Sequence, residues 1–362
     1  MIILLRSTDG NPDSRFEKYV TFLANCKVDY FTICWDRFGI KTSTNNTLYY
    51  KCKSAYGLHF KNLINLLGFN WFLIKKLIKY RSKYKVIHAA DFDTIIPAIL
   101  MKFIFRKKVI YDIYDWYIDS RRINNSILKW IIKKIEYINI TYSDIVIICE
   151  EGRKEQIIYT PKKLWILPNI PYFNLPTIDN KINKRLLISY IGILGSGRGL
   201  LNLLKLAKEH PEIDFVSAGF GELENEFKAA AKLSNFNYYG RVSYSTALQI
   251  MSSSDIIYAM YERVNPNHLL AAPNKYYEGL ALGKPIITTI GTLVGNKVEK
   301  FSTGYCIDED YDSLNNLVIN ITSEDIAEKS KNSKELWYNT YKDYINRFFH
   351  KEYLKFIINC HE

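Results

Sequence analysis

The amino-acid sequence predicts an α/β protein of two domains, each built on a parallel β-sheet with helices on both faces. Three observations lead to this prediction. The 362 residues exceed what one hydrophobic core usually serves. Short apolar runs alternate with amphipathic helical patterns, and this alternation occurs twice along the chain. A proline-rich segment separates the two series.

The first series consists of short apolar runs joined by polar turns and helical stretches. Strands are predicted at Ile2–Leu5, Tyr30–Cys34, Val86–Ala89, Lys108–Asp112 and Ile145–Cys149. Helices are predicted between them at Ser14–Ala24, Asn62–Tyr80, Thr94–Phe105 and Ser126–Tyr142. Strands alternating with helices of this length favour a parallel sheet.

The segment 166–176 contains Pro168, Pro171 and Pro176, which favour an extended chain and a domain boundary. We therefore expect a first domain over residues 1–170 and a second over 171–334. The second alternation predicts strands Leu186–Gly192, Asp214–Ala218, Phe236–Tyr239, Asp255–Met260 and Pro285–Thr289, with helices Leu200–Glu209, Glu222–Ala231, Ser245–Met251 and Asn274–Leu282. The tail 335–362 holds a long aromatic helix, for which the first domain is a candidate packing partner.

The positive charge of the chain is confined to its first half. Residues 1–170 contain 28 Lys and Arg against 15 Asp and Glu, a net charge of +13, whereas residues 171–362 have a net charge of −1. Such a surface indicates an anionic partner, and no nucleic-acid-binding motif accompanies it; a generally basic surface is the alternative. The six cysteines and six histidines are scattered, which argues against disulfides and a metal cluster. With no signal-peptide pattern at its start, the chain is expected to be cytoplasmic.

A Gly-rich turn follows the first strand of the second series, in Tyr190–Gly199 (YIGILGSGRG). Glycines such as Gly195 let a backbone approach an anion, and a helix N-terminus binds phosphate. Ser196 lies in the turn, and Arg198 adds a bidentate phosphate donor. Tight strand–helix packing is the alternative explanation, but the arginine favours a diphosphate site.

A second motif is the helix that begins after Pro273, in PNKYYEGLALGKP (273–285). Asn274 and Lys275 fall in its first turn, where a lysine is unfavourable unless an anion is near. Glu278 lies one turn later on the same face and can accept hydrogen bonds from sugar hydroxyls. A plain amphipathic helix would explain the terminal glycine, Gly283, but not this polar face.

In these motifs, together with 218–222, 239–242 and 254–257, the carboxyl half resembles the nucleotide-binding domain of GT-B glycosyltransferases of the group 1, or family-4-like, type. The resemblance implies two Rossmann-like domains facing each other across a cleft. It further implies a hexosyltransferase-type enzyme in which Arg198 and Lys275 bind the donor diphosphate and Glu278 holds the ribose. The form of the second motif in this chain, which begins Pro-Asn-Lys at residues 273–275, is similar to that of bacterial exopolysaccharide transferases, some of which are inverting enzymes. Two positions depart from the family pattern, Ile193 and Leu270.

The amino half resembles the acceptor domain less specifically, through 85–91 and 109–115. An inverting mechanism needs a base for the acceptor hydroxyl, and Asp115, Asp112 and Asp9 all follow predicted strand ends. Helix capping or turn formation is an equal alternative for each. Asp91 and Asp93 resemble the metal-binding Asp-x-Asp of GT-A transferases, but they fit a strand end and a helix cap better. We therefore expect no metal or cofactor.

The segment Lys61–Lys85 combines aromatic and aliphatic residues with dense lysines, as in helices at a membrane interface. Two further basic clusters lie at 103–108 and 129–134. A core-facing helix with a solvated basic end is the alternative. The sequence therefore predicts transfer of a sugar from a nucleotide sugar to a surface glycan or lipid-linked acceptor at an anionic membrane surface. A GT-B-fold sugar-nucleotide epimerase and a catalytically silent binding subunit remain alternatives.

Overall fold

The computed structural model describes residues 1–10, 13–54, 59–121, 123, 125–172 and 183–360. Two compact units are formed, the first by residues 1–168 and 346–362 and the second by residues 169–345. Of the predicted boundary segment, Pro168 and Pro171 are described, whereas Pro176 lies outside the described residues.

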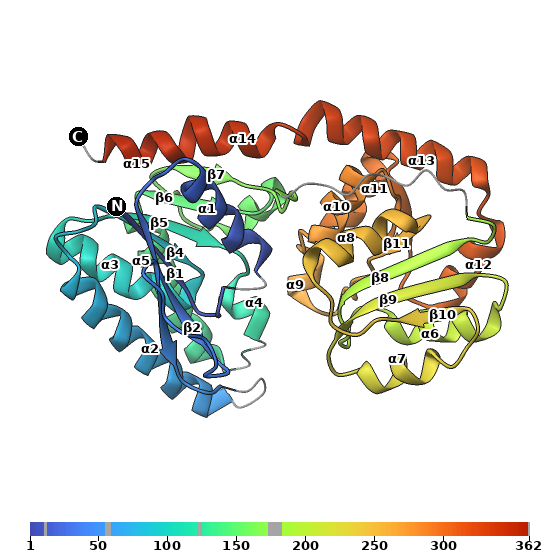
Figure 1. Ribbon diagram of the computed structural model, residues 1–362, viewed down its shortest axis with the longest axis horizontal. Coiled ribbons are helices and arrows are strands. Elements are labelled where there is room, and N and C mark those ends of the chain that lie inside the picture. The colour runs from blue at the N-terminus through green and yellow to red at the C-terminus, as the bar shows by residue number, and fades with distance from the viewer. Residues whose placement is uncertain (11–12, 55–58, 122, 124, 173–182, 361–362) are drawn as a thin grey trace. The chain divides into compact units, whose positions relative to one another are not determined.

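Unit 1 contains a seven-stranded sheet in the order β3-β2-β1-β4-β5-β6-β7, with every neighbouring pair parallel (Figure 1). Its strands are β1 (Ile2–Arg6), β2 (Tyr30–Asp36), β3 (Thr47–Lys51), β4 (Val86–Ala90), β5 (Lys108–Ile113), β6 (Ile145–Ile148) and β7 (Leu164–Ile166). Its helices are α1 (Ser14–Asn25), α2 (His59–Lys79), α3 (Phe92–Phe105), α4 (Tyr117–Arg121), α5 (Ser126–Tyr142), a short 3-10 helix (Glu151–Gln156), α14 (Tyr344–Phe348) and α15 (Lys355–Asn359).

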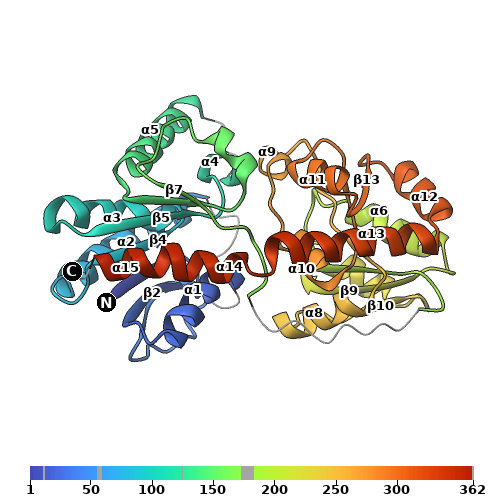
Figure 2. The same cartoon turned by 90° about the horizontal axis from the view of Figure 1, so that it is seen from above.

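Both faces of this sheet are covered, which explains its continuous apolar strands. Ile3 and Leu5 belong to one core with the buried side chains of α2, α3 and α5. On the other face α1 meets the tail, where the rings of Phe22 and Phe349 stack with centroids 4.6 Å apart. The hydroxyl of Tyr353 lies 2.9 Å from Nδ1 of His88 on β4. Figure 2 shows α14 and α15 beside α1.

Unit 2 contains a six-stranded parallel sheet in the order β10-β9-β8-β11-β12-β13. Its strands are β8 (Leu187–Ile193), β9 (Asp214–Phe220), β10 (Phe236–Tyr238), β11 (Ile256–Tyr258), β12 (Ile286–Thr289) and β13 (Gly304–Ile307). Its helices are α6 (Leu200–Glu209), α7 (Glu224–Ala230), α8 (Tyr244–Ser253), α9 (Pro266–Leu269), α10 (Asn274–Leu282), α11 (Leu293–Phe301), α12 (Tyr311–Asn320) and α13 (Ser323–Leu336). A π-helical turn follows α13 at Trp337–Tyr341, and a second one, Phe349–Leu354, belongs to unit 1.

Six consecutive strands in each sheet follow the doubly wound order 3-2-1-4-5-6, and the predicted α/β class with two Rossmann-like domains is confirmed. In such sheets the strand order reverses between the first and fourth strands, and ligands bind beyond the carboxyl ends of the strands at that point. In unit 1 this position lies after β1 and β4, and in unit 2 after β8 and β11. Of the predicted site residues, Asp9 follows β1 and the Gly-rich turn follows β8, whereas Asp112 lies in β5 and Asp115 follows it.

Candidate functional site

The Gly-rich turn of unit 2 connects β8 to α6 and includes Gly195 and Ser196. Gly192 has φ +150°, and a Cβ atom added there would lie 2.9 Å from the Nζ atom of Lys275. Gly197 has φ +80°, and a Cβ atom there would lie 2.9 Å from Cε1 of His268. Glycine is therefore required twice, for the backbone angles and for the close approach of two side chains.

Lys275 is the second residue of α10, and its ammonium lies beside this turn. The Nζ atom is 4.9 Å from the centroid of the Tyr190 ring on β8. Within the described residues, Lys275 makes no ion pair. Burial and then the positive charge of Arg198 lower the pKa of Lys275 to about 7, and Glu278 acts in the opposite direction. The lowered pKa marks a place where an added negative charge would be strongly favoured.

Arg198 brings a second cation to the same place, one residue before the N-cap of α6. Its guanidinium carbon lies 5.6 Å from the ring centroid of Tyr261, which follows β11. Both cations therefore lie at helix N-termini, where positive charge is unfavourable for the helix itself. An anion bound between them would be stabilised by both side chains and by the helix dipoles.

Glu278 lies one turn after Asn274 on α10, and its side chain is only 4% exposed. The hydroxyl of Tyr244 donates a 2.9 Å hydrogen bond to its Oε1 atom. This bond fixes the carboxylate close enough to Lys275 to influence its pKa. Asn274 begins the helix and is partly exposed. The structure thus brings together Arg198, Lys275 and Glu278.

We expect Glu278→Gln to weaken nucleoside diphosphate binding by roughly 10-fold or more, the effect of losing a hydrogen bond to a charged group. The melting temperature should stay close to that of the wild type, because the amide oxygen can still accept the hydrogen bond from Tyr244. Calorimetric titration and thermal denaturation measure the two effects. A variant that unfolds, while its folded fraction binds normally, would show that Glu278 is structural.

The three predicted catalytic aspartates of unit 1 differ in their surroundings. Asp112 is fully buried, where Arg15 Nη2 lies 2.7 Å from Oδ1 and the Tyr19 hydroxyl donates a 2.7 Å bond to Oδ2. Burial raises the pKa of Asp112, but Arg15 and His88 together outweigh burial and hold this pKa well below the usual range. In this structure the side chains around Asp112 leave no part of its carboxylate exposed.

Asp115 and Asp9 have accessible side chains. The side chain of Asp115 is 55% exposed and lies 3.4 Å from Nη2 of Arg153, a buried residue that also donates to the Tyr114 carbonyl at 2.7 Å. Asp9 forms a longer ion pair, with 3.7 Å between its Oδ2 and Nζ of Lys41. Asp115 is therefore the most open of the three carboxylates.

Asp91 and Asp93 have different partners. Asp91 forms an ion pair with Arg6, and its Oδ1 accepts a 2.9 Å bond from the Tyr114 backbone N–H. Burial raises the pKa of Asp91 to about 6, against the effect of Arg6. Its side chain makes no capping bond to α3, contrary to our expectation. Asp93 is buried and accepts a 2.9 Å bond from the Ser7 hydroxyl. No group of three possible metal ligands occurs among the described residues.

Solved structures share this architecture over the whole chain. Sucrose-phosphate synthase from Thermosynechococcus elongatus superposes with a TM-score of 0.74 at 13% identity, covering 99% of this chain and 100% of that one. A glycosyltransferase from Rickettsia africae gives 0.65 at 14% identity, covering 100% and 98%. HepE from Anabaena, in complex with UDP and glucose, gives 0.65 at 12% identity, covering 93% and 94%. The protein has the GT-B fold.

Sequence comparison adds nothing to this result, because no family model and no curated protein matches the chain. The GT-B resemblance inferred from the Gly-rich turn and the α10 motif is thus confirmed at the level of the fold. With identities of 11–14% among the solved structures named here and the trehalose-6-phosphate structure from E. coli, the comparison shows the fold and assigns no residue.

Sequence reasoning did not select four residues that lie in or beside the candidate sites in the tertiary structure. Tyr190, Tyr244 and Tyr261 lie against Lys275, Glu278 and Arg198, respectively, and no sequence spacing links these pairs. Asp91 was interpreted as a helix cap. Its φ of +66° is costly for a non-glycine residue, by about 1–3 kcal/mol, and such strain concentrates at functional sites.

Proposed function

We propose that the protein is a nucleotide-sugar-dependent glycosyltransferase that binds the donor diphosphate at the Gly192–Gly199 turn of unit 2. The observation that carries this proposal is the Lys275 ammonium, which lies beside the turn with a pKa lowered chiefly by burial and with no ion pair among the described residues. Arg198 and the N-termini of α6 and α10 add positive potential there. The UDP-bound and UDP-glucose-bound HepE structures of the same fold support a nucleotide-sugar donor.

Unit 1 is proposed to bind the acceptor, a surface glycan or a lipid-linked saccharide, as in polysaccharide biosynthesis. Asp115 is proposed as the base that takes the acceptor hydroxyl proton, because its carboxylate is the most open of the three candidates. Asp112 is better explained as a structural partner of Arg15. A hexosyl group is the proposed transferred group.

The test is a thermal-shift screen with UDP, GDP, ADP and their sugars, followed by donor hydrolysis without acceptor. A bound nucleotide at about 100 times its Kd stabilises the fold by roughly 2.7 kcal/mol. We expect one nucleotide class to raise the melting temperature. The protein should also hydrolyse the nucleotide sugar of that class. Binding without hydrolysis would instead favour the silent subunit.

We further expect hydrolysis and transfer to persist in EDTA, because Lys275, Arg198 and two helix dipoles can offset the diphosphate charge. The measurement compares rates before and after chelation, with and without added Mg²⁺ or Mn²⁺. Complete loss of activity in EDTA that either metal restores would contradict this prediction. Asp91 and Asp93 would then be the candidate metal ligands.

An anionic membrane is the proposed docking partner of unit 1. Helices α2, α3 and α5 form one layer on the sheet, in which α3 contacts both others. Of the 27 large exposed apolar side chains among the described residues, 14 lie on these three helices. They are Ile64, Leu67, Trp71, Ile78, Ile96, Leu100, Phe103, Ile104, Ile127, Leu128, Trp130, Ile131, Ile138 and Tyr142. An apolar surface of this extent is unusual for a face that meets only water.

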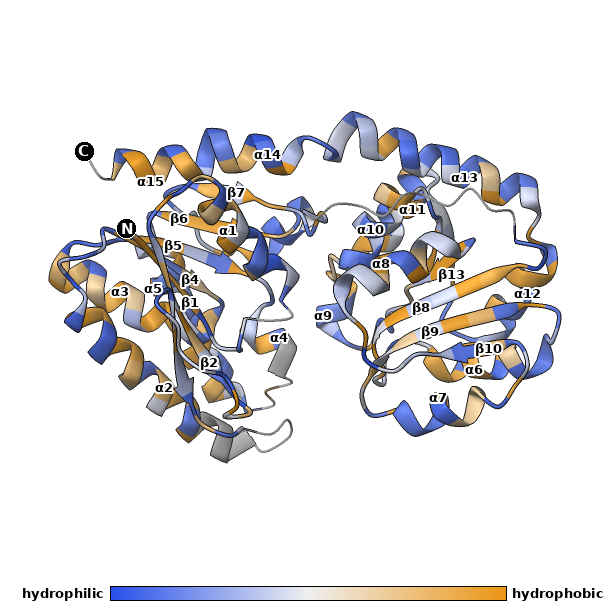
Figure 3. Cartoon of the chain, in the orientation of Figure 1, coloured by the Kyte–Doolittle hydropathy of each residue, from blue (hydrophilic) through white to orange (hydrophobic). Residues whose placement is uncertain are grey.

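The charges of this α2–α3–α5 face fit anionic headgroups. Lys75 lies 5.2 Å from the Trp71 ring and Lys134 lies 5.8 Å from the Trp130 ring, so each tryptophan has an ammonium beside it. Asp93 and Glu136, the acidic residues of the three helices, are both buried. Figure 3 shows hydrophobic and hydrophilic residues interleaved along α2 and α3. The side chains of residues 59–63, which include Lys61, lie outside the described residues. No helix in the described ranges is long and apolar enough to cross a bilayer.

We expect the protein to co-sediment with phosphatidylglycerol vesicles at low salt. Each lysine near the membrane surface contributes about 1 kcal/mol of electrostatic attraction, which salt screens. The binding free energy from inserted tryptophans does not depend on salt in this way. The double variant Trp71→Glu with Trp130→Glu should reduce binding at every salt concentration. Ile319→Glu, on an exposed position of α12 in unit 2, is the matched control. Failure to bind these vesicles at low salt would favour a soluble acceptor.

A further inference from the structure

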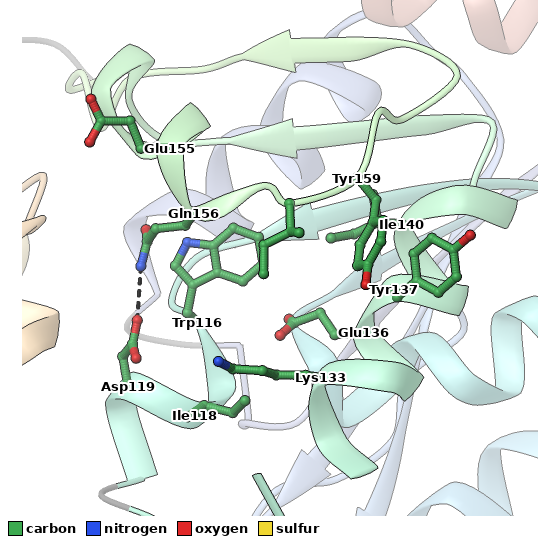
Figure 4. A pocket seen from close by; sticks show the side chains of 11 residues that line it. Trp116, Ile118, Asp119, Lys133, Glu136, Tyr137, Ile140, Glu155, Gln156 and Tyr159 are labelled. Carbon is green, nitrogen blue, oxygen red and sulfur yellow. Dashed lines mark hydrogen bonds between the residues drawn. The ribbon is translucent and has the colours of Figure 1, made fainter. Parts of the chain in front are cut away.

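Unit 1 contains a pocket of about 210 Å³ that no role described above uses (Figure 4). It lies among α4, α5 and the 3-10 helix Glu151–Gln156 with the residues that follow it. Trp116, which forms part of its wall, is the residue after Asp115 and follows the carboxyl end of β5. Trp116 thus connects the pocket to the carboxyl edge of the sheet, beside the strand next to the switch point between β1 and β4.

Aromatic rings form much of its lining. Figure 4 shows the Trp116 indole on one side and the rings of Tyr137 and Tyr159 on the other. The two tyrosine rings have centroids 3.8 Å apart. Ile118, Ile140 and Ile158 complete an apolar wall. Flat aromatic surfaces of this kind bind ligands that present an apolar face.

Polar atoms in the pocket have fewer partners than they can accommodate. Glu136 is 7% exposed, and its carboxylate receives one 3.2 Å hydrogen bond, from the Tyr111 hydroxyl. Trp116 is 5% exposed, and its indole N–H has no hydrogen-bond partner among the described residues. Gln156 donates its amide N–H to Asp119 at 2.9 Å, but its Oε1 has no such partner.

These groups are costly when left unsatisfied. Buried polar atoms without hydrogen bonds are rare in folded proteins, and water, an ion, local strain or a functional role accounts for those that occur. Burial also raises the pKa of Glu136 to about 7, so this carboxyl is held in an environment that does not compensate its charge. A purely structural Glu136 would be expected to have more hydrogen-bond donors around it.

We infer that this pocket binds one neutral pyranose ring of the acceptor. A sugar ring presents a C–H face to Trp116 and the tyrosines, and its hydroxyls can both donate to Glu136 and accept from the indole N–H. This inference rests on the proposed transferase function and specifies the acceptor. The volume of the pocket is about 210 Å³, which is smaller than the ~300–1,000 Å³ of pockets for drug-sized ligands. This size suits one sugar ring rather than an oligosaccharide.

Other ligand classes fit the lining less well. An aliphatic chain would leave Glu136, Gln156 and the Trp116 indole N–H without partners. An anionic group would meet the carboxylates of Asp119, Glu136 and Glu155, with Lys133 as the single cation of the lining. A neutral ring with several hydroxyls avoids both penalties.

The inference is tested by fluorine NMR of the full-length protein labelled with 5-fluorotryptophan. The Trp116 signal is assigned with Trp116→Phe. The probes are neutral methyl hexosides and methyl N-acetylhexosaminides, with methyl glucuronide and hexanol for comparison. We expect a neutral glycoside to shift the Trp116 signal in a saturable manner. A Trp116 signal that responds to none of the neutral glycosides, or more strongly to glucuronide or hexanol, overturns the inference.

Two variants and a matched control refine the test. Glu136→Gln keeps an acceptor for the Tyr111 hydroxyl, and we expect at least fivefold weaker glycoside binding. Gln156→Leu, at a partly exposed position, serves the same purpose if Glu136→Gln does not fold. Glu151→Gln, an exposed site on the same 3-10 helix outside the lining, should bind like the wild type. Unchanged affinity in both pocket variants would also overturn the inference.

Donor hydrolysis, measured on the same samples, separates this inference from the transferase proposal. We expect both pocket variants to hydrolyse the donor at the wild-type rate without acceptor. Glycoside binding at Trp116 in a protein that hydrolyses no nucleotide sugar would support the pocket and contradict the transferase. Hydrolysis without glycoside binding at Trp116 would support the transferase and overturn the pocket assignment.

Discussion

Lys275→Ala and Arg198→Ala should each weaken nucleoside diphosphate binding by roughly 1.5–3 kcal/mol, which is about 10- to 150-fold in Kd. Both cations lie at the Gly-rich turn, and each would donate charge-assisted hydrogen bonds to the same anion. Calorimetric titration of the wild type and both variants measures the effect. Because Arg198 lowers the pKa of Lys275, the two substitutions should not be additive.

The pH dependence of binding is a second readout of Lys275. Burial and then Arg198 lower its pKa to about 7 in the free protein, and a bound diphosphate should raise that pKa. Only the protonated ammonium attracts the anion, so affinity should fall as pH rises above about 7, by at most about tenfold per unit. The fall ends at the higher pKa of the complex. Lys275→Ala should abolish this dependence.

Lys300→Ala, at an exposed position of α11 in the same unit, is the matched control, and its Kd should equal that of the wild type. If Lys275→Ala and Arg198→Ala also bind with unchanged affinity, the diphosphate does not bind at this turn. The Gly-rich turn would then serve only strand–helix packing.

Asp115→Asn should lower kcat by about 10²–10⁴-fold, the usual contribution of a general base, with little change in donor Kd. The open carboxylate of Asp115 follows β5 and can reach an acceptor hydroxyl without disturbing a buried ion pair. Transfer rates at saturating donor and acceptor measure kcat, and a thermal scan confirms that the variant is folded.

Asp112 and Asp9 are informative comparisons for this prediction. Asp112→Asn should destabilise the protein, because Arg15 would keep its charge in a buried site after losing its partner; such losses cost about 3–5 kcal/mol. Asp9→Asn should retain most of the activity. A kcat within threefold of the wild type for Asp115→Asn would place the base elsewhere, with Asp91 the next candidate, or indicate a mechanism that needs none.

The strands that sequence reasoning located and those it missed differ in burial. The predicted strands of unit 1, such as Ile2–Leu5 and Val86–Ala89, lie inside the sheet and are almost entirely apolar, with His88 as an exception, because helices cover both faces. The missed strands β3, β7 and β13 all lie at sheet edges. An edge strand is short and partly exposed, so its residues carry a weak apolar signal.

The residues proposed for the donor site have a stronger local signal in the sequence than those proposed for catalysis. Arg198, Lys275 and Glu278 each belong to a motif at the start of a helix, where local backbone geometry restricts the side chain. For the three candidate catalytic aspartates, a position at or after the end of a strand does not show which other side chains surround the carboxylate. Asp112 and Asp115 are three residues apart, yet one is enclosed by Arg15 and Tyr19 and the other is open.

The sequence by itself determined the α/β class and the order of most strands and helices, because these depend on periodicity and on local turn chemistry. It also contains the motifs from which a diphosphate site is proposed. Only the tertiary structure decided which polar groups are accessible and which are paired. It placed Tyr190 and Tyr261 against the two cations, and it left Glu136 in an aromatic pocket. Such contacts join residues far apart in the chain, and the free energy of a charged group depends on every neighbour that surrounds it.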